Sequence, residues 1–162
     1  LEYVSKLNKS LLLLSKIDNH QFSESKDVCH NEVLHRYVND YQEVYSYRDI
    51  RLEVEEQGEL HWKMNETLAV VLVTNLLKNA FVHNIDKGSI RIIISSKGIR
   101  FGNTGTGESL DALRIFERFY QGSKKKEGST GLGLAIVDAV CRHSSLQICY
   151  RFEENMHWFE LE

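Results

Sequence analysis

Two glycines precede an apolar helical pattern in the stretch STGLGLAIV, where Gly131 and Gly133 stand among leucines. Glycine at the start of a helix lets the backbone approach another group closely. The first N–H groups of a helix lack intrahelical partners and attract anions. The stretch therefore predicts a helix start at Gly131, with the backbone N–H groups of Leu132, Gly133 and Leu134 offered to phosphate oxygens.

A polar stripe interrupts the apolar stretch NLLKNAFVHN. Asn75, Asn79 and His83 are spaced four apart, so they share one face of a helix. An unpaired buried amide costs about 1–3 kcal/mol, so these side chains need partners. Two interpretations stay open at this point: bridging to neighbouring loops, or a stripe that faces a ligand. In the second, an amide oxygen is available to a hard cation such as Mg²⁺.

A glycine-rich stretch, FGNTGTG, follows directly after a predicted strand. Asn103, Gly105 and Gly107 alternate there, which allows the backbone to approach a flat ligand closely. An ordinary hairpin turn is the alternative. The chain has neither the glycine fingerprint of dinucleotide-binding folds nor a Walker loop.

The stretch IFERFYQGSKKKEG combines an apolar-aromatic anchor with a basic segment. Ile115, Phe116, Phe119 and Tyr120 are expected to attach its start to the core, and Lys124–Lys126 follow. Glycines on both sides of the lysines suit a mobile lid with positive charge, while a merely solvated lysine run is the alternative.

The elements that must position these motifs follow from hydrophobic periodicity. Helices are expected over 1–20, 31–47, 65–84 (capped by Asn65) and 131–143, and hairpin-like strand pairs over 49–56 with 59–64, 89–95 with 98–102, and 146–152 with 156–162. This pattern predicts an α/β (α+β) two-layer sandwich, with a mixed, mainly antiparallel sheet and helices on one face.

Length, charge and composition limit the classes of protein to which the chain is expected to belong. The 162 residues suit about one domain, and the net charge of −3 gives no reason to expect nucleic-acid binding. Cys29, Cys141 and Cys149 form no paired motif and are expected to be buried thiols. No stretch reaches membrane-spanning length.

Taken together, N-x-x-x-N-A, N-x-G-x-G, I-F-E-R-F-Y and G-L-G-L, in this order, resemble the ATP-binding catalytic domain of sensor histidine kinases. These domains share the Bergerat-type ATP-binding fold with gyrase, chaperone and mismatch-repair ATPases. The resemblance covers residues 22–162. Residues 1–21 resemble the C-terminal part of the second helix of the dimerisation and phosphoacceptor hairpin, so the chain is expected to be part of a longer protein.

The resemblance implies a site for ATP and Mg²⁺. Asn79 is the expected magnesium ligand, Asn75 and Arg118 are the expected catalytic residues beside the phosphates, and Asn103 accepts a hydrogen bond from the adenine amino group. The full set of implied nucleotide-binding residues comprises Asn75, Asn79, His83, Asn103, Gly105, Gly107, Arg118, Thr130, Gly131, Leu132, Gly133 and Leu134.

Three departures from the family pattern qualify this expectation. Asn103 stands where an aspartate is usual, which predicts weaker adenine binding and less secure discrimination against GTP. Val82 stands where a lysine or arginine is usual, and His83 is a candidate for that polar contact. No histidine is followed by an acidic residue and a proline, because the chain has no proline. We therefore expect negligible autophosphorylation.

The function implied is transfer of the γ-phosphoryl group of Mg-ATP to a histidine on the missing phosphoacceptor domain, and onward to a response regulator receiver domain. The full protein is expected to be a homodimer attached to the inner membrane, with this domain in the cytoplasm. The alternatives are an anti-sigma-factor-type serine kinase and a non-catalytic nucleotide-binding module.

Overall fold

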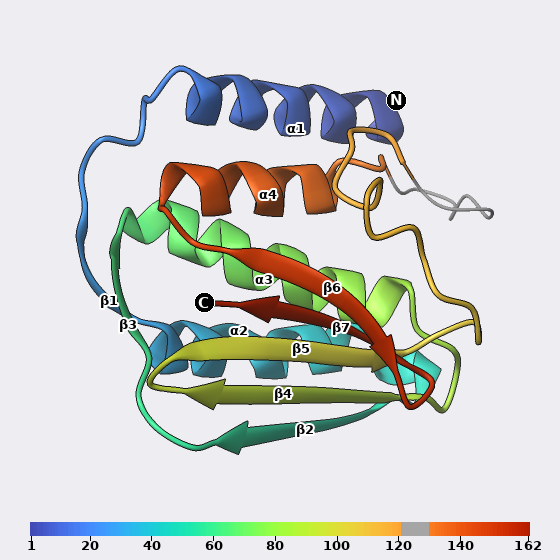
Figure 1. Cartoon of the computed structure of the whole chain (residues 1–162). Coiled ribbons are helices and arrows are strands. Elements are labelled where there is room, and N and C mark those ends of the chain that lie inside the picture. The colour runs from blue at the N-terminus through green and yellow to red at the C-terminus, as the bar shows by residue number, and fades with distance from the viewer. Residues whose placement is uncertain (121–129) are drawn as a thin grey trace.

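The computed structural model describes residues 1–120 and 130–162 and shows one layer of helices on one sheet (Figure 1). The elements are, in chain order, α1 (Glu2–Asp18), β1 (Lys26–Cys29), α2 (His30–Val44), the 3-10 helix η1 (Ser46–Arg48), β2 (Arg51–Glu56), β3 (His61–Met64), α3 (Glu66–Val82), β4 (Ser89–Ser95), β5 (Gly98–Thr104), α4 (Gly133–His143), β6 (Ile148–Glu153) and β7 (Met156–Leu161).

The main sheet has five strands in the order β2-β4-β5-β7-β6. Only β2 and β4 pair in parallel, and the other neighbours are antiparallel. The chain passes from β2 to its parallel partner through α3, as a parallel pair requires a crossover connection. The predicted mixed, mainly antiparallel sheet with helices on one face is confirmed, as are the hairpins β4–β5 and β6–β7.

The predicted hairpin of 49–56 with 59–64 is wrong. Strand β2 pairs with β4, whereas β3 pairs with β1 in a separate two-stranded sheet. The cause is Asn31 on α2, whose amide donates to Gly58 O at 3.0 Å and accepts from Leu60 N at 2.8 Å. These bonds hold the connection against α2, and Leu60 is fully buried. The chain therefore leaves the main sheet instead of folding back on β2.

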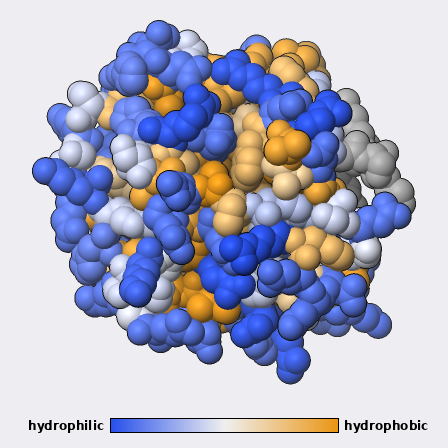
Figure 2. Space-filling model, viewed as in Figure 1, coloured by the Kyte–Doolittle hydropathy of each residue, from blue (hydrophilic) through white to orange (hydrophobic). Residues whose placement is uncertain are grey.

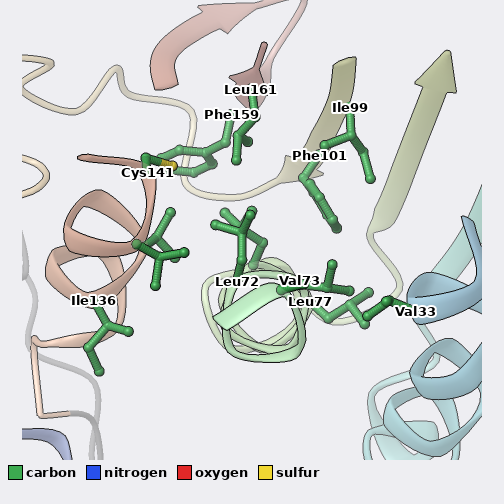
Figure 3. Packing of buried hydrophobic residues seen from close by; sticks show 14 of the residues in the cluster. Val33, Leu72, Val73, Leu77, Ile99, Phe101, Ile136, Cys141, Phe159 and Leu161 are labelled. Atoms are coloured by element: carbon green, nitrogen blue, oxygen red, sulfur yellow. The ribbon is translucent and has the colours of Figure 1, made fainter. Parts of the chain in front are cut away.

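Helix α3 is central in the helical layer, between α2 and α4 and under the sheet (Figure 3). Its apolar residues point to several sides, as with Leu72 towards the sheet and Leu77 towards Val33 of α2, so the weak amphipathic pattern reflects burial on most sides. Asn65 caps the helix as predicted, accepting a hydrogen bond from Leu68 N at 3.1 Å.

Helix α1 packs against α4 on the side of that helix away from α3 (Figure 1). Leu14 and Ile17 are buried there, so the end of α1 shares the core of the remaining chain. None of the helices in the described ranges is long and apolar enough to cross a membrane. Figure 2 shows hydrophilic side chains over most of one face, with hydrophobic atoms in patches between them.

The expectation of three buried thiols holds for one cysteine only. Cys141 is buried in α4, and burial raises the pKa of its thiol to about 12. Cys29 is half-buried at the end of β1, and Cys149 is exposed on β6. The two strand cysteines lie at a sheet end and on an outer face, where periodicity alone does not predict burial.

Candidate functional site

The polar stripe lies on α3 as the spacing predicts. Asn75 and Asn79 are half-buried residues of the helix, and His83 is the residue that ends it. Asn75 Nδ2 donates to Val71 O within the helix at 2.8 Å. This bond orients the amide so that its oxygen, Oδ1, is the atom that faces outward from the helix.

The N-terminus of α4, residues Thr130–Leu134, lies beside this stripe. A Cβ built on Gly133 would lie 3.5 Å from Asn75 Oδ1, so the first residue of α4 is close to the amide oxygen. Gly131 has a φ of 72°, a left-handed conformation that favours glycine. The helix consequently begins at Gly133, two residues later than predicted.

The backbone N–H groups at the start of α4 have no side-chain cap among the described residues. Leu132 occupies the N-cap position and makes no side-chain cap bond, and its own N–H donates to Thr130 Oγ1 at 3.3 Å. An uncapped helix N-terminus carries positive partial charge and suits an anion. The predicted anion-binding turn therefore lies against the predicted polar stripe.

The end of β5 forms the other side of the candidate site. Asn103 is only 2% exposed, and its Nδ2 donates to Thr104 O at 2.9 Å. That bond leaves Oδ1 as the acceptor atom of the side chain. Gly105 lies close to α3, because a Cβ there would be 3.1 Å from His83 O. Gly107 is exposed with open space around it.

A hydrogen-bonded chain holds the segment after β5. Leu110 N donates to the Tyr150 hydroxyl at 3.0 Å, and that hydroxyl lies 2.6 Å from His157 Nδ1. His157 Nε2 reaches Thr106 O at 3.2 Å, so the neutral ring accepts at Nδ1 and donates at Nε2. Burial lowers the pKa of His157, in keeping with a neutral ring.

Sequence reasoning missed the group that fixes α3 to the end of β5, here named the α3–β5 junction and defined as Asn84, Gly88 and Thr104. Asn84 is 2% exposed, donates to Ala80 O and Ser89 O, and accepts from Thr104 Oγ1 at 2.5 Å. Gly88 has no room for a side chain, because a Cβ would lie 2.1 Å from Asn84 Oδ1. The signal available in the sequence was a polar residue and a glycine in the short connection between α3 and β4.

Arg48 of η1 was also missed. Its guanidinium donates to the carbonyl oxygens of Phe81 and Asn84, at 2.6 Å in the second case, and pairs with Asp86 at 2.9 Å. These bonds satisfy carbonyl groups that the end of a helix leaves without partners. Nothing in the local sequence around Arg48 indicates this role, since its partners lie more than thirty residues away.

Arg118, which the sequence assigns to the phosphates, pairs with Asp18 of α1 at 3.1 Å. The anchor predicted from Ile115, Phe116, Phe119 and Tyr120 is formed in part, and Tyr120 is half-buried with the Arg114 guanidinium 4.8 Å from its ring centroid. Ile115 is buried and Phe116 meets the ring of Phe159 edge-on, whereas Phe119 is 52% exposed and does not act as an anchor. Lys124–Lys126 lie outside the described residues.

The model of the histidine kinase-, DNA gyrase B-, and HSP90-like ATPase family matches residues 64–157, more than half of the chain. This chain belongs to that family. The match begins at the end of β3 and includes α3, the end of β5 and the N-terminus of α4, which are the elements that carry the candidate site.

The sequence is also similar to sensor kinases. The heme sensor protein HssS of Staphylococcus epidermidis is 32% identical over 151 residues, which are 90% of this chain and 33% of that protein. The sensor histidine kinase RppB of Synechocystis is 31% identical over 147 residues, 85% of this chain and 32% of that protein. The chain thus spans about a third of the length of these curated relatives.

Solved structures share the fold. A mycobacterial sensor histidine kinase, MprB, superposes with a TM-score of 0.74 at 20% identity, covering 85% of this chain and 95% of that one. Full-length ShkA in complex with AMPPNP gives a TM-score of 0.74 at 20% identity, covering 98% of this chain and 35% of that one. The chain is therefore a domain of the histidine kinase-, DNA gyrase B-, and HSP90-like ATPase family that is similar in sequence to sensor histidine kinases and in fold to their catalytic domains.

Proposed function

We propose that residues 22–162 bind Mg-ATP and donate its γ-phosphoryl group to a histidine of a dimerisation and phosphoacceptor domain, for onward transfer to an aspartate of a response regulator. The observation that carries the proposal is the approach of Gly133 to Asn75 Oδ1 at the uncapped start of α4. Backbone N–H donors and amide oxygens meet there, and this donor set suits phosphates together with a hard cation.

Each part of the candidate site is assigned its own role in binding the nucleotide. Asn103 Oδ1 accepts from the adenine amino group, while Gly105 and Gly107 let the backbone lie close to the ring. The N–H groups of the α4 N-terminus (Thr130–Leu134) bind the phosphates. His83, at the end of α3, is assigned a polar contact with the nucleotide.

Asn79 is assigned as the magnesium ligand, because it is a half-buried amide one helical turn beyond Asn75. When bound, Mg²⁺ neutralises phosphate charge and orients the phosphoryl group. Arg118 is assigned to the phosphates, which requires it to leave Asp18. With these roles, this chain positions the nucleotide and neutralises the charge of its phosphates, whereas the nucleophilic histidine belongs to another domain.

The relatives favour the histidine kinase function over the two alternatives, an anti-sigma-factor-type serine kinase and a non-catalytic nucleotide-binding module. HssS and RppB are named as a heme sensor and a sensor histidine kinase. The partners proposed are accordingly a phosphoacceptor domain and a receiver domain, in a homodimeric, membrane-attached protein of which this is a cytoplasmic domain.

Calorimetric titration with ATP tests the binding step. We expect binding with Mg²⁺ that weakens when the metal is chelated, and Asn79→Ala should weaken Mg-ATP binding about tenfold or more, as for loss of a hydrogen-bonding partner to a charged group. Asn39→Ala, at an exposed position of α2, is the matched control and should bind like the parent.

Labelled ATP tests the transfer step. With γ-labelled ATP we expect the chain alone to stay unlabelled, and an added phosphoacceptor domain from a homologous sensor kinase to become labelled on histidine. Mg-ATP binding without such labelling supports the non-catalytic module. Labelling of a serine in an added protein supports the serine kinase, and strong labelling of the chain itself contradicts the proposal.

A further inference from the structure

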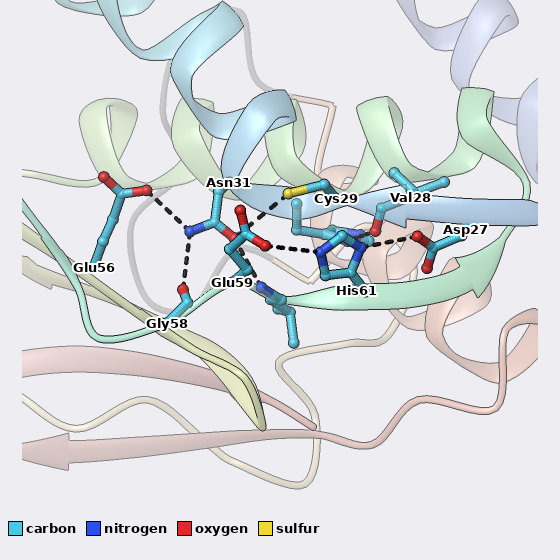
Figure 4. A network of polar contacts seen from close by, with 10 residues as sticks. Asp27, Val28, Cys29, Asn31, Glu56, Gly58, Glu59 and His61 are labelled. Atoms are coloured by element: carbon cyan, nitrogen blue, oxygen red, sulfur yellow. Dashed lines mark hydrogen bonds and ion pairs between the residues drawn. The ribbon is translucent and has the colours of Figure 1, made fainter.

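A second cluster of chemically active side chains lies where β1 pairs with β3. The two strands are antiparallel, and Cys29 is directly opposite His61. Glu59, two residues before His61, reaches the imidazole with Oε2 at 3.3 Å from Nε2. Figure 4 shows the three side chains gathered at this end of the two-stranded sheet.

The three residues offer the atoms that zinc-type ions prefer. Cys29 Sγ, a carboxylate oxygen of Glu59 and a ring nitrogen of His61 all lie within 4.8 Å of one another. Around a tetrahedral zinc ion such ligand atoms are about 3.3–3.6 Å apart. Glu59 and His61 are exposed, so small side-chain rotations suffice to close the remaining gap.

Asp27 gives the cluster a feature that an ordinary surface charge pair lacks. Its Oδ2 lies 2.9 Å from His61 Nδ1, on the side of the ring opposite Nε2 (Figure 4). A carboxylate that accepts from the far nitrogen of a histidine fixes the ring and its tautomer, and metal-binding histidines are held in this way. The bond leaves Nε2 as the ligand atom, and Nε2 is the nitrogen beside Glu59.

We propose that Cys29, Glu59 and His61 bind one divalent ion of the zinc class, with Asp27 as the residue that positions His61. The thiolate favours such ions over Mg²⁺ and Ca²⁺, which prefer oxygen ligands. On binding, the thiol and the His61 Nε2–H that faces Glu59 both release their protons to solvent, and the thiol gives up its weak contact with Asn31 Oδ1, 3.9 Å away. Three protein ligands leave a fourth position for water.

The position of the cluster indicates what the ion does. Strand β1 follows the connection from α1, and β3 leads directly into α3 through Asn65. A bound ion joins the two strands at one point of their ladder. The cluster lies at the end of the two-stranded sheet where β1 passes into α2, whereas Asn79 lies in the last turns of α3 and His83 directly follows that helix. The inference is therefore independent of the nucleotide site.

Cobalt(II) titration of the whole chain tests the proposal. We expect one ion per chain, a thiolate-to-cobalt charge-transfer band in the near ultraviolet and the strong visible bands of four-coordinate cobalt. Cys29→Ser should abolish the charge-transfer band. Cys149→Ser is the matched control, since Cys149 is also a strand cysteine beside a carboxylate, 3.7 Å from Glu160 Oε2, and it should leave the spectrum unchanged.

Asp27→Asn separates positioning from ligation. It should weaken cobalt affinity about 10- to 100-fold while keeping both sets of bands, as expected for loss of an outer-shell partner. Zinc should raise the melting temperature of the parent and of Cys149→Ser but not of Cys29→Ser. Circular dichroism checks folding, and Cys29→Ala replaces Cys29→Ser if that variant is unfolded.

Failure of the parent to take up cobalt or zinc overturns the proposal. So does a charge-transfer band that survives Cys29→Ser, or a spectrum of six-coordinate cobalt that His61→Ala leaves unchanged. Titration with Mg-ATP, performed on the same samples, should give the same affinity with and without zinc.

Discussion

The two sides of the candidate site are built differently. At the α3–β5 junction, Asn84 makes hydrogen bonds with both its amide nitrogen and its oxygen, and Gly88 leaves space for them. At the α4 N-terminus, Leu132 makes no side-chain cap bond and Gly131 adopts a left-handed conformation. At the junction, the polar atoms of the Asn84 side chain find their hydrogen-bond partners within the folded chain. At the start of α4, backbone N–H donors are left for an anion. One side of the site therefore fixes the geometry, and the other supplies the positive partial charge.

The largest expected effect comes from filling the space at the junction. Gly88→Ala places a Cβ against Asn84 Oδ1, Thr104 Oγ1 and the Ile85 carbonyl, all closer than real contacts allow. We expect the free energy of unfolding to fall by about 3 kcal/mol, the upper range for overpacking that also breaks buried hydrogen bonds. Urea denaturation measures it. Gly107→Ala, with open space around it, should change stability by less than about 0.5 kcal/mol.

An intermediate effect is expected for the side chain that meets adenine. Asn103→Asp replaces a neutral acceptor by a charged one, worth about 1 kcal/mol more at the adenine contact, but it loses the bond from Nδ2 to Thr104 O, so ATP affinity should rise by at most about fivefold. The ratio of ATP to GTP affinity should rise as well, since an aspartate cannot donate to a guanine oxygen. Calorimetry with both nucleotides measures this. Equal selectivity in the parent and the variant refutes the assignment of Asn103.

A smaller effect is expected at the rim, where Arg118 is held by Asp18. The two side chains are about half exposed, and such ion pairs contribute about 0.2–1 kcal/mol. Asp18→Asn should release Arg118 for the phosphates and tighten Mg-ATP binding about 1.5- to 5-fold. Asp138→Asn removes a comparable pair with Arg142 on α4 and should leave the affinity unchanged. Weaker binding in Asp18→Asn contradicts the role given to Arg118.

The smallest effect concerns pH and the segment after β5. Burial lowers the pKa of His157, so the unfolded chain takes up a proton near pH 6.5 while the native ring stays neutral. Stability should therefore decline as the pH falls below about 7, and less steeply in His157→Gln. The buried His30, whose pKa burial lowers to about 4, contributes equally in both proteins. Equal slopes of the free energy of unfolding against pH in the parent and in His157→Gln, between pH 7 and pH 5, would exclude this role for His157.

Local sequence patterns were sufficient to predict the helices and strands that carry the motifs. The apolar run of α3 with Asn65 as its cap, and the hairpin of β4 with β5, follow from short-range signals. The strand pairing within 49–64 does not follow from short-range signals. Gly58 stands between two alternating segments, and this pattern favours a hairpin unless a distant group binds the connection. That group is Asn31, which no local signal near Gly58 indicates.

The candidate site was predictable to a similar degree. Spacing along one helix placed Asn75 and Asn79 on one face, and glycine placement marked the α4 N-terminus. The supports depend on contacts between distant parts of the chain. Arg48 reaches the end of α3, and Arg118 meets Asp18 across one hundred residues. A four-residue strand such as β1, with two charged residues, carries too weak a pattern to be recognised.

In the proposed function, the α4 N-terminus and the α3 stripe bind the phosphates and magnesium together. The most direct test is nuclear magnetic resonance of the labelled chain, titrated with Mg²⁺ and a non-hydrolysable ATP analogue. The account predicts the largest shifts at the backbone amides of Leu132, Gly133 and Leu134 and at the side-chain amides of Asn75 and Asn79. Saturable binding with those resonances unmoved, and the shifts elsewhere, would contradict it.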